Sequence, residues 1–382
     1  MNFIDLGAQY LTLKKRIDNR IQEVLDHGQY IMGPEVFDLE LKLAEYVGVK
    51  HCISCGNGTD ALQLSLMALG VSSGDAVFCP TFSFFASAEV IPLTGSTPKF
   101  VDVDPGTFNI DPGNLEKQIE ECISEGILTP KAIIAVNLFG LPANYPQIKK
   151  IAQKHGLLLI EDAAQGFGGK IDKHQACSFG DLSTTSFFPA KPLGCYGDGG
   201  AIFTNNDKYA ERLNSLRSHG KGENKYDNIR IGMNSRLDTI QAAILLEKFS
   251  VFPNELESRE EIARSYTAAF KDIASTPTFD NAYFSSWAQY TLKVNNRNAI
   301  ISELSKKGIP TSIYYQTCIH SQTAFGNTYL EKDLPVAKML SSSVLSLPIH
   351  PYLKEKEQQL IIRQVRNVLK QFPQNPELGV KT

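Results

Sequence analysis

The feature of this chain that most constrains its fold is the alternation of short apolar runs with segments of helical periodicity. The runs are apolar on both faces and rich in β-branched residues, which is typical of strands buried between helices. The predicted strands are 51–55, 76–79, 98–103, 131–138, 157–161, 183–188 and 201–204, and the predicted helices are 60–69, 84–93, 114–125, 145–155 and 208–218. This pattern predicts an α/β fold with a mainly parallel sheet that helices cover on both sides.

After residue 238 the pattern changes, because the predicted strands become fewer. A helix over 238–249 is broken at 250–253 and is followed by a second helical stretch over 255–270. The remaining predicted elements are strands at 287–294, 311–315 and 345–348 and helices at 297–307 and 354–369. We therefore expect a large α/β domain over 1–250 and a smaller C-terminal α+β domain over 251–382.

Charge and cysteine content exclude several classes of protein. The 38 Lys and Arg against 41 Asp and Glu leave a net charge of −3, without the basic excess of a nucleic-acid binder. No apolar run reaches the ~20 residues that span a bilayer, and the first residues lack a secretory pattern. Seven scattered cysteines indicate reduced thiols in a cytoplasmic protein, and the lone Cys52-x-x-Cys55 lacks a second ligand pair, so no metal site is expected.

A glycine-containing turn, Gly56-Asn57-Gly58-Thr59, follows the first predicted strand and opens a predicted helix. Free N–H groups at a helix start, together with the helix dipole, form a site for a phosphate. Asn57 or Thr59 as an ordinary helix cap explains the turn equally well. Gly56 through Ala61 also matches G-x-G-x-x-A, the fingerprint of a nicotinamide dehydrogenase, but no acidic residue lies where the ribose would need it.

Two further segments carry single reactive groups. An apolar strand delivers Asp162 to its C-terminal end, where a buried carboxylate needs a cationic partner such as a protonated ring nitrogen. Lys191 follows an aromatic strand, and desolvation there would favour the free amine that condenses with an aldehyde. An N-cap at Asp162 and a solvated surface lysine are the simpler alternatives. A phosphate site, a carboxylate and an amine together match the phosphate, the ring nitrogen and the aldehyde of pyridoxal 5'-phosphate (PLP).

On these motifs the chain resembles the DegT/DnrJ/EryC1/StrS family of sugar aminotransferases, which have the type I fold of PLP-dependent transferases. The resemblance covers nearly the whole chain. Its strongest anchors are the segments 57–62, 161–165, 187–201 and 232–243. It implies a large domain with a mostly parallel seven-stranded sheet, a smaller C-terminal α+β domain, and a homodimer with shared active sites.

The resemblance also assigns catalytic roles. Lys191 should bind the cofactor covalently and later carry the proton between substrate and cofactor, and Asp162 should keep the ring nitrogen protonated. Gln165 should donate a hydrogen bond near the phenolic oxygen of the cofactor. Because Lys191 is present, transamination is expected, with L-glutamate giving its nitrogen and leaving as 2-oxoglutarate.

The remaining cofactor contacts follow from the same resemblance. Gly58, Thr59 and Ser186 should hold the phosphate, and Asn234 should reach it from the partner subunit. Phe84 matches the aromatic residue that stacks on the cofactor ring, although three phenylalanines at 82, 84 and 85 are also typical of plain core.

The expected acceptor is a nucleotide-linked keto sugar, in a route to surface polysaccharide such as the O-antigen of lipopolysaccharide. Residues 3–6, 28–35 and 186–204 are most similar to UDP-2-acetamido-2-deoxy-3-oxo-D-glucuronate aminotransferases, in which an arginine matching Arg236 meets the sugar carboxylate. An ion pair at a helix start or interface is the alternative for Arg236.

One contact to the substrate departs from the family pattern. Where relatives often read His-Tyr-Pro, this chain reads Tyr314-Tyr315-Gln316, and tyrosine cannot act as a cation at neutral pH. A 3-oxo or 4-oxo 6-deoxyhexose on UDP or dTDP is therefore the second candidate substrate. The alternatives from other classes are a nicotinamide dehydrogenase and a PLP-fold protein that serves as a binding or regulatory module.

Overall fold

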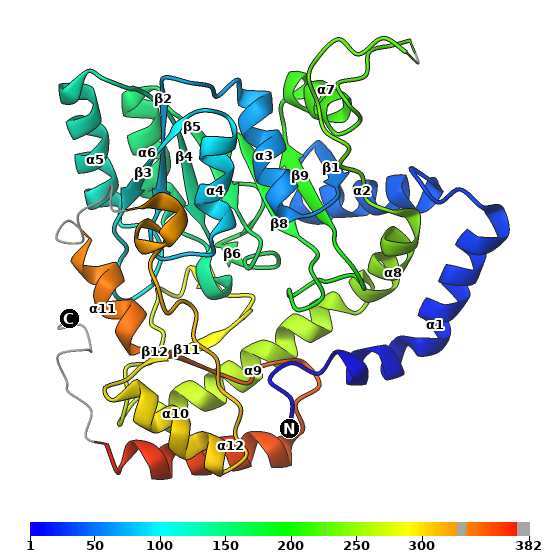
Figure 1. Ribbon diagram of the computed structural model, residues 1–382. Coiled ribbons are helices and arrows are strands. Elements are labelled where there is room, and N and C mark those ends of the chain that lie inside the picture. The colour runs from blue at the N-terminus through cyan, green and yellow to red at the C-terminus, as the bar shows by residue number, and fades with distance from the viewer. Residues whose placement is uncertain (225, 327–333, 373–382) are drawn as a thin grey trace.

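The computed structural model describes residues 1–224, 226–326 and 334–372. Its centre is a seven-stranded sheet with the order β1-β9-β8-β5-β4-β2-β3, flanked by helices (Figure 1). The strands are β1 (His51–Cys55), β2 (Asp75–Pro80), β3 (Thr97–Val101), β4 (Thr129–Val136), β5 (Leu158–Asp162), β8 (Leu182–Ser186) and β9 (Gly200–Thr204). All neighbours pair in parallel except at β9, which is antiparallel to both β1 and β8. The predicted α/β fold with a mostly parallel sheet is confirmed.

Helices cover both faces of this sheet because successive strand residues point to opposite cores. Val77 and Cys79 of β2 pack in one core with helices α3, α4 and α7, whereas Ala76 and Phe78 pack in another with α5 and α6. The helices on the two faces and along the edge at β1 are α2 (Pro34–Val47), α3 (Gly58–Leu69), α4 (Ala86–Leu93), α5 (Pro112–Glu125), α6 (Tyr145–His155), α7 (Asp207–Leu216) and α8 (Thr239–Phe249). The predicted break between two helices is present but shorter than expected, because α8 ends at Phe249 and α9 (Phe252–Phe270) begins after residues 250–251.

The C-terminal part has its own apolar core, which begins in the second half of α9, whereas Ala337 and Leu340 pack in another cluster with Phe82 and Val103 of the sheet-bearing part. The elements of the C-terminal part are β11 (Tyr290–Lys293), α10 (Arg297–Lys306), α11 (Pro335–Ser343), β12 (Val344–Leu347) and α12 (Glu355–Leu369). β11 and β12 form an antiparallel pair, and the side chains of one cluster run from Ile262 to Leu369. In Figure 1 the long helix α9 connects this part to the sheet-bearing part above it.

Several elements differ from the sequence predictions. The helices α1 (Leu6–His27) and α2 precede every predicted element, and α1 packs along α8 (Figure 1). The predicted strand at 311–315 is wrong, because only Ser312 pairs, in an isolated bridge to Ser346. Short strands and turns of 3-10 helix complete the structure: β6 (Lys170–Ile171), β7 (His174–Gln175), β10 (Tyr283–Phe284), η1 (Leu138–Gly140), η2 (Ile319–Ser321) and η3 (Thr323–Phe325).

Two properties bear on the surroundings of the protein. All seven cysteines are buried, and none of them forms a disulfide. Within the described residues, none of the helices combines the length and apolar character that crossing a bilayer requires.

Candidate active site

The three segments with predicted cofactor residues end at the same edge of the sheet. β5 ends at Asp162 and β8 at Ser186, and these two strands run parallel. β1 runs in the same direction, since both β1 and β8 are antiparallel to β9, and it ends just before α3 begins at Gly58. Ligands of open α/β sheets bind beyond the C-terminal ends of the strands, so the topology brings these residues to the place where a ligand is expected.

The N-terminus of α3 is shaped for close approach of a ligand. Asn57 caps the helix, because its side chain accepts a hydrogen bond from the Asp60 N–H at 2.7 Å. Among the described residues, the N–H groups of Gly58 and Thr59 have no acceptor. A Cβ atom at Gly58 would lie only 2.7 Å from the Cβ of Ser186, so glycine is required for this packing. The cap and the two free N–H groups form an anion site with the Ser186 hydroxyl beside it.

Asp162 is a buried carboxylate, 4% exposed, with one donor on each oxygen. The Ser87 hydroxyl donates to Oδ2 at 2.8 Å, and the Ala164 N–H donates to Oδ1 at 3.1 Å. Burial raises the pKa of Asp162, while the two hydrogen bonds and the charge of Lys191 act in the opposite direction. These donors favour the ionised form that a protonated ring nitrogen needs.

Lys191 lies in the turn after β8, where its backbone N–H donates to the Phe188 carbonyl at 2.9 Å. Its side chain is half-buried. Burial lowers the pKa of Lys191, and the negative charge of Asp162 opposes this shift. The lowered pKa increases the fraction of neutral amine, which is the form that attacks an aldehyde.

Gln165 and the aromatic residues form a connected group beside this pair. The Gln165 side chain accepts from the Phe139 N–H at 2.7 Å and donates to the Tyr315 hydroxyl at 2.8 Å. The Tyr315 ring lies 6.3 Å from the Phe84 ring and 5.8 Å from the Tyr314 ring. Burial raises the pKa of Tyr315, so its phenol stays protonated at neutral pH. We call the group around Gly58, Asp162 and Lys191 the strand-end site. The segment around residue 314 thus reaches this site from the C-terminal part of the chain.

Asn234 and Arg236 form a second, separate group. The Arg236 Nη2 donates to the Asn234 Oδ1 at 2.6 Å, and the Asn234 side chain is exposed. Ser235 between them is buried and donates to Asp60 Oδ2 at 2.6 Å, which fixes the segment beside the start of α3. An open cavity of about 710 Å³ lies here, and its lining includes Arg230 and Arg236.

The strand-end site fits PLP on the properties of the protein groups alone. An anion site at α3, a buried and doubly hydrogen-bonded carboxylate, and an amine with a lowered pKa correspond to the phosphate, ring nitrogen and aldehyde of that cofactor.

A model of the DegT/DnrJ/EryC1/StrS aminotransferase family matches residues 11–366. The chain belongs to this family. A UDP-2-acetamido-2-deoxy-3-oxo-D-glucuronate aminotransferase of Pseudomonas aeruginosa is 45% identical to it, over 96% of this chain and 100% of the relative. A crystal structure of a DegT/DnrJ/EryC1/StrS aminotransferase from Brucella abortus has 51% identity and a TM-score of 0.94, covering 96% of this chain and 99% of that one.

A second solved structure, S. venezuelae DesV in complex with a ketimine intermediate, is 33% identical with a TM-score of 0.92, covering 97% and 98% of the two chains. The predicted family, the type I fold, the aminotransferase activity and the PLP cofactor are thereby confirmed. The nicotinamide dehydrogenase is not supported, since residues 11–366 match an aminotransferase family. The roles of individual residues stay predictions.

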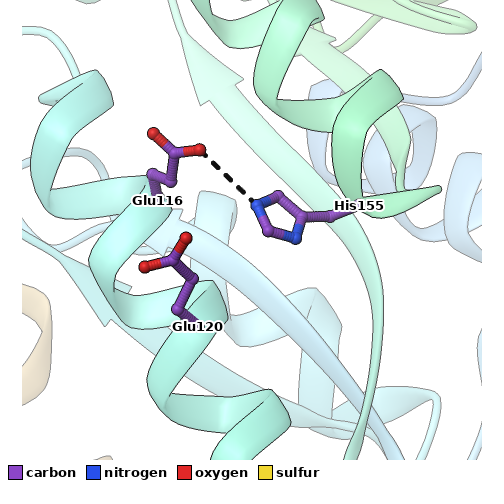
Figure 2. A group of neighbouring side chains, drawn as sticks. All are labelled: Glu116, Glu120 and His155. Carbon is purple, nitrogen blue, oxygen red and sulfur yellow. Dashed lines mark ion pairs between the residues drawn. The ribbon is translucent and has the colours of Figure 1, made fainter.

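A group of acidic and histidine side chains lies away from this site. Glu116 and Glu120 of α5 face His155 at the end of α6 (Figure 2). His155 precedes the N-terminal end of β5, whereas Asp162 lies at its C-terminal end. The Lys154 Nζ lies 2.6 Å from Glu116 Oε1 and 3.3 Å from Glu120 Oε1, so an ammonium group already pairs with both carboxylates.

Sequence reasoning missed two groups that shape the site. Ser87 is an ordinary serine within a predicted helix, and nothing in its surroundings in the sequence points to Asp162. The backbone N–H of Phe139, which holds the Gln165 amide, belongs to a residue with a φ of 59°. A positive φ at a phenylalanine has no sequence signal, because that conformation is unusual for an aromatic residue.

Proposed function

We propose that this aminotransferase transfers an amino group from L-glutamate to the keto group of a nucleotide-linked sugar, UDP-2-acetamido-2-deoxy-3-oxo-D-glucuronate. The catalytic part of this proposal is carried by the placement of Lys191 near the buried Asp162 at the strand ends, where the two charges interact. The sugar is supported by the relative that is 45% identical over its full length.

Each residue of the strand-end site has a defined task in this proposal. When bound, PLP supplies an electron sink that stabilises negative charge at the reacting carbon. Lys191 holds the cofactor through its aldehyde and then moves the proton at the reacting carbon with its Nζ. Asp162 keeps the ring nitrogen protonated, and Gln165 donates a hydrogen bond beside the phenolic oxygen.

The same proposal gives the remaining residues binding roles. Gly58, Thr59 and Ser186 hold the phosphate at the start of α3, where N–H groups and a hydroxyl are available. Phe84 covers the cofactor ring, and its side chain is 54% exposed on the described chain, which leaves its face free for such a contact.

Arg236 is proposed to bind the carboxylate of the sugar, because a guanidinium group pairs with a carboxylate through two parallel hydrogen bonds. Its place beside an open cavity that also contains Arg230 supports an anionic substrate. Tyr314 and Tyr315 would contribute hydroxyl groups on the other side of the substrate.

We also propose a homodimer in which Asn234 and Arg236 of one subunit complete the site of the other. Apolar side chains on α2 support such an interface, since Phe37 and Leu41 are 54% and 69% exposed one turn apart. The Asn234 side chain is exposed, and among the described residues its hydrogen bond is to nearby Arg236, so we expect a second partner for it on another chain.

The setting of the enzyme is proposed from its chemistry. Buried cysteines that form no disulfide are typical of a cytoplasmic protein. The product would be an amino sugar for a surface polysaccharide such as the O-antigen of lipopolysaccharide. A boundary at residue 250 between a PLP-binding domain and a C-terminal domain is supported by the separate apolar core after Ile262.

The experiment is a panel of keto sugars given to enzyme that carries its cofactor in the amino form. Conversion is measured as the loss of the amino form of the cofactor in the absorption spectrum. We expect the fastest conversion with UDP-2-acetamido-2-deoxy-3-oxo-D-glucuronate. The control is the same panel with enzyme in the aldehyde form, which cannot aminate a sugar. Equal or faster conversion of neutral sugars would contradict the proposed substrate.

A neutral sugar is the second candidate because of one substitution. The family resemblance leads us to expect a histidine where this chain has Tyr314, and the lack of a possible cation would weaken recognition of a carboxylate at that side. A 3-oxo or 4-oxo 6-deoxyhexose on UDP or dTDP would then be the acceptor, and the same panel of sugars decides between the two.

A further inference from the structure

The donors of Asp162 are arranged in a short relay of hydroxyl groups. Ser87, the second residue of α4, lies 2.8 Å from Asp162 Oδ2, and the Ser83 hydroxyl lies 3.1 Å from that of Ser87. Both serines are almost fully buried, at 3% and 1% exposure for Ser83 and Ser87. Water is therefore a poor substitute for either contact.

Chemistry fixes the direction of these hydrogen bonds. An ionised carboxylate only accepts, so the single proton of the Ser87 hydroxyl must be donated to Asp162. Ser87 can then only accept from Ser83, and both hydroxyl dipoles point toward the carboxylate. The Ala164 N–H donates to the other oxygen, so the carboxylate is held at both ends in one orientation.

We infer that Ser87 is a positioning residue for the cofactor, whose hydroxyl keeps Asp162 ionised and oriented for pairing with the ring nitrogen. The inference rests on the proposed role of Asp162 in PLP binding. Without Ser87, a buried carboxylate would keep a single neutral donor and would be free to rotate. Ser83 would act one step further away, through Ser87.

The decisive comparison is between Ser87→Ala and Ser87→Thr in the full-length protein. Ser87→Ala removes the hydroxyl, and we expect the apoprotein to bind PLP about tenfold more weakly, since a hydrogen bond to a charged group is lost. Ser87→Thr keeps the hydroxyl, so this variant should bind PLP with about the affinity of the wild type. Ser83→Ala should weaken binding by only about twofold to threefold, because it acts through a neutral contact.

The spectrum of the bound cofactor provides a second readout. If the ring nitrogen is protonated in a smaller fraction of the molecules in Ser87→Ala, the Lys191 Nζ that is attached to the cofactor becomes more basic. The pH midpoint of the visible absorbance should therefore rise by roughly half a unit or more. A purely structural role for Ser87 would change the melting temperature without moving this midpoint.

The matched control is Ser65→Ala. Ser65 is also fully buried, but its hydroxyl donates to the Ala61 carbonyl within α3 at 2.7 Å, and so its removal tests burial alone. The inference is overturned if Ser87→Ala keeps the wild-type affinity and midpoint, if Ser65→Ala changes them equally, or if Ser87→Thr fails to restore them. A wild-type protein that binds no PLP would instead refute the proposed function.

Discussion

The strand-end site and the segment around Arg236 are held in place in different ways. Asp162 and Gln165 are buried, and the side chain of each has two hydrogen-bond partners among the described residues. Asn234 is exposed, and its side chain is bonded to Arg236, two residues away. In the proposed dimer, one subunit preorganises Asp162 and Gln165 for the cofactor, whereas Asn234 and Arg236 would complete the site of the partner.

The largest expected effect comes from Lys191→Ala, which tests the preorganised side. Loss of the amine removes both the covalent attachment and the proton carrier, and we expect activity to fall by roughly a hundredfold to ten-thousandfold. Borohydride treatment followed by mass spectrometry should locate the cofactor on Lys191 in the wild type and on no lysine in the variant.

Lys248→Met is the matched control for Lys191→Ala. Lys248 is only 1% exposed, and burial lowers its pKa to about 8, yet it faces the Tyr196 ring at 4.9 Å rather than a carboxylate at the strand ends. We expect Lys248→Met to keep the covalent attachment at Lys191. Fixation of the cofactor at Lys248 in the wild type would contradict the assignment.

The next largest effect is expected from Arg236→Ala, which tests the substrate side. Removing a guanidinium that pairs with a carboxylate should lower kcat/KM for an acidic keto sugar by about tenfold to a hundredfold. A neutral 6-deoxy sugar should lose far less. Equal losses of kcat/KM for both sugars would contradict recognition of the carboxylate by Arg236. The control is Arg230→Ala, which removes a positive charge at the same cavity and shows how much of the loss of kcat/KM is due to charge alone.

Asn234→Ala tests whether Asn234 contacts the cofactor of its own subunit or that of the partner subunit. Loss of one hydrogen bond to a phosphate should weaken PLP binding by about tenfold. If the contact crosses the dimer, mixing Lys191→Ala and Asn234→Ala subunits should restore part of the activity, because one intact site forms in each mixed dimer. Mixing that restores nothing, although native mass spectrometry detects mixed dimers, would place Asn234 within its own subunit.

The smallest effect concerns the electrostatics of the preorganised pair. The charge of Asp162 raises the pKa of Lys191, so Asp162→Asn should lower it. Because the neutral amine reacts, the pH profile for attachment of PLP to apoprotein should move by about one unit to lower pH. Asp198→Asn, an exposed aspartate nearby, should leave the profile in place. A shift to higher pH would contradict the sign of this coupling.

The strands and most helices of the sheet-bearing part could be predicted from the sequence. The predicted strand 51–55 and helix 145–155 coincide with β1 and α6, because buried parallel strands and amphipathic helices have strong local patterns. The strand predicted at 311–315 was wrong, since its short apolar run is used for aromatic contacts through Tyr314 and Tyr315 rather than for pairing.

The sequence identified three candidates because each residue type is unusual at its position. Lys191 is a lysine among apolar residues, Asp162 is a carboxylate at the end of a strand, and Gly58 is a glycine at the start of a helix. The donors from Ser87 and from the Phe139 N–H were not recognisable. These contacts join residues that are distant along the chain, and the tertiary structure determines them by placing Ser87 of α4 beside the end of β5 and Phe139 of η1 beside the turn that follows β5. Local composition can reveal a reactive group, but the neighbours that set its charge and orientation come from the folded arrangement.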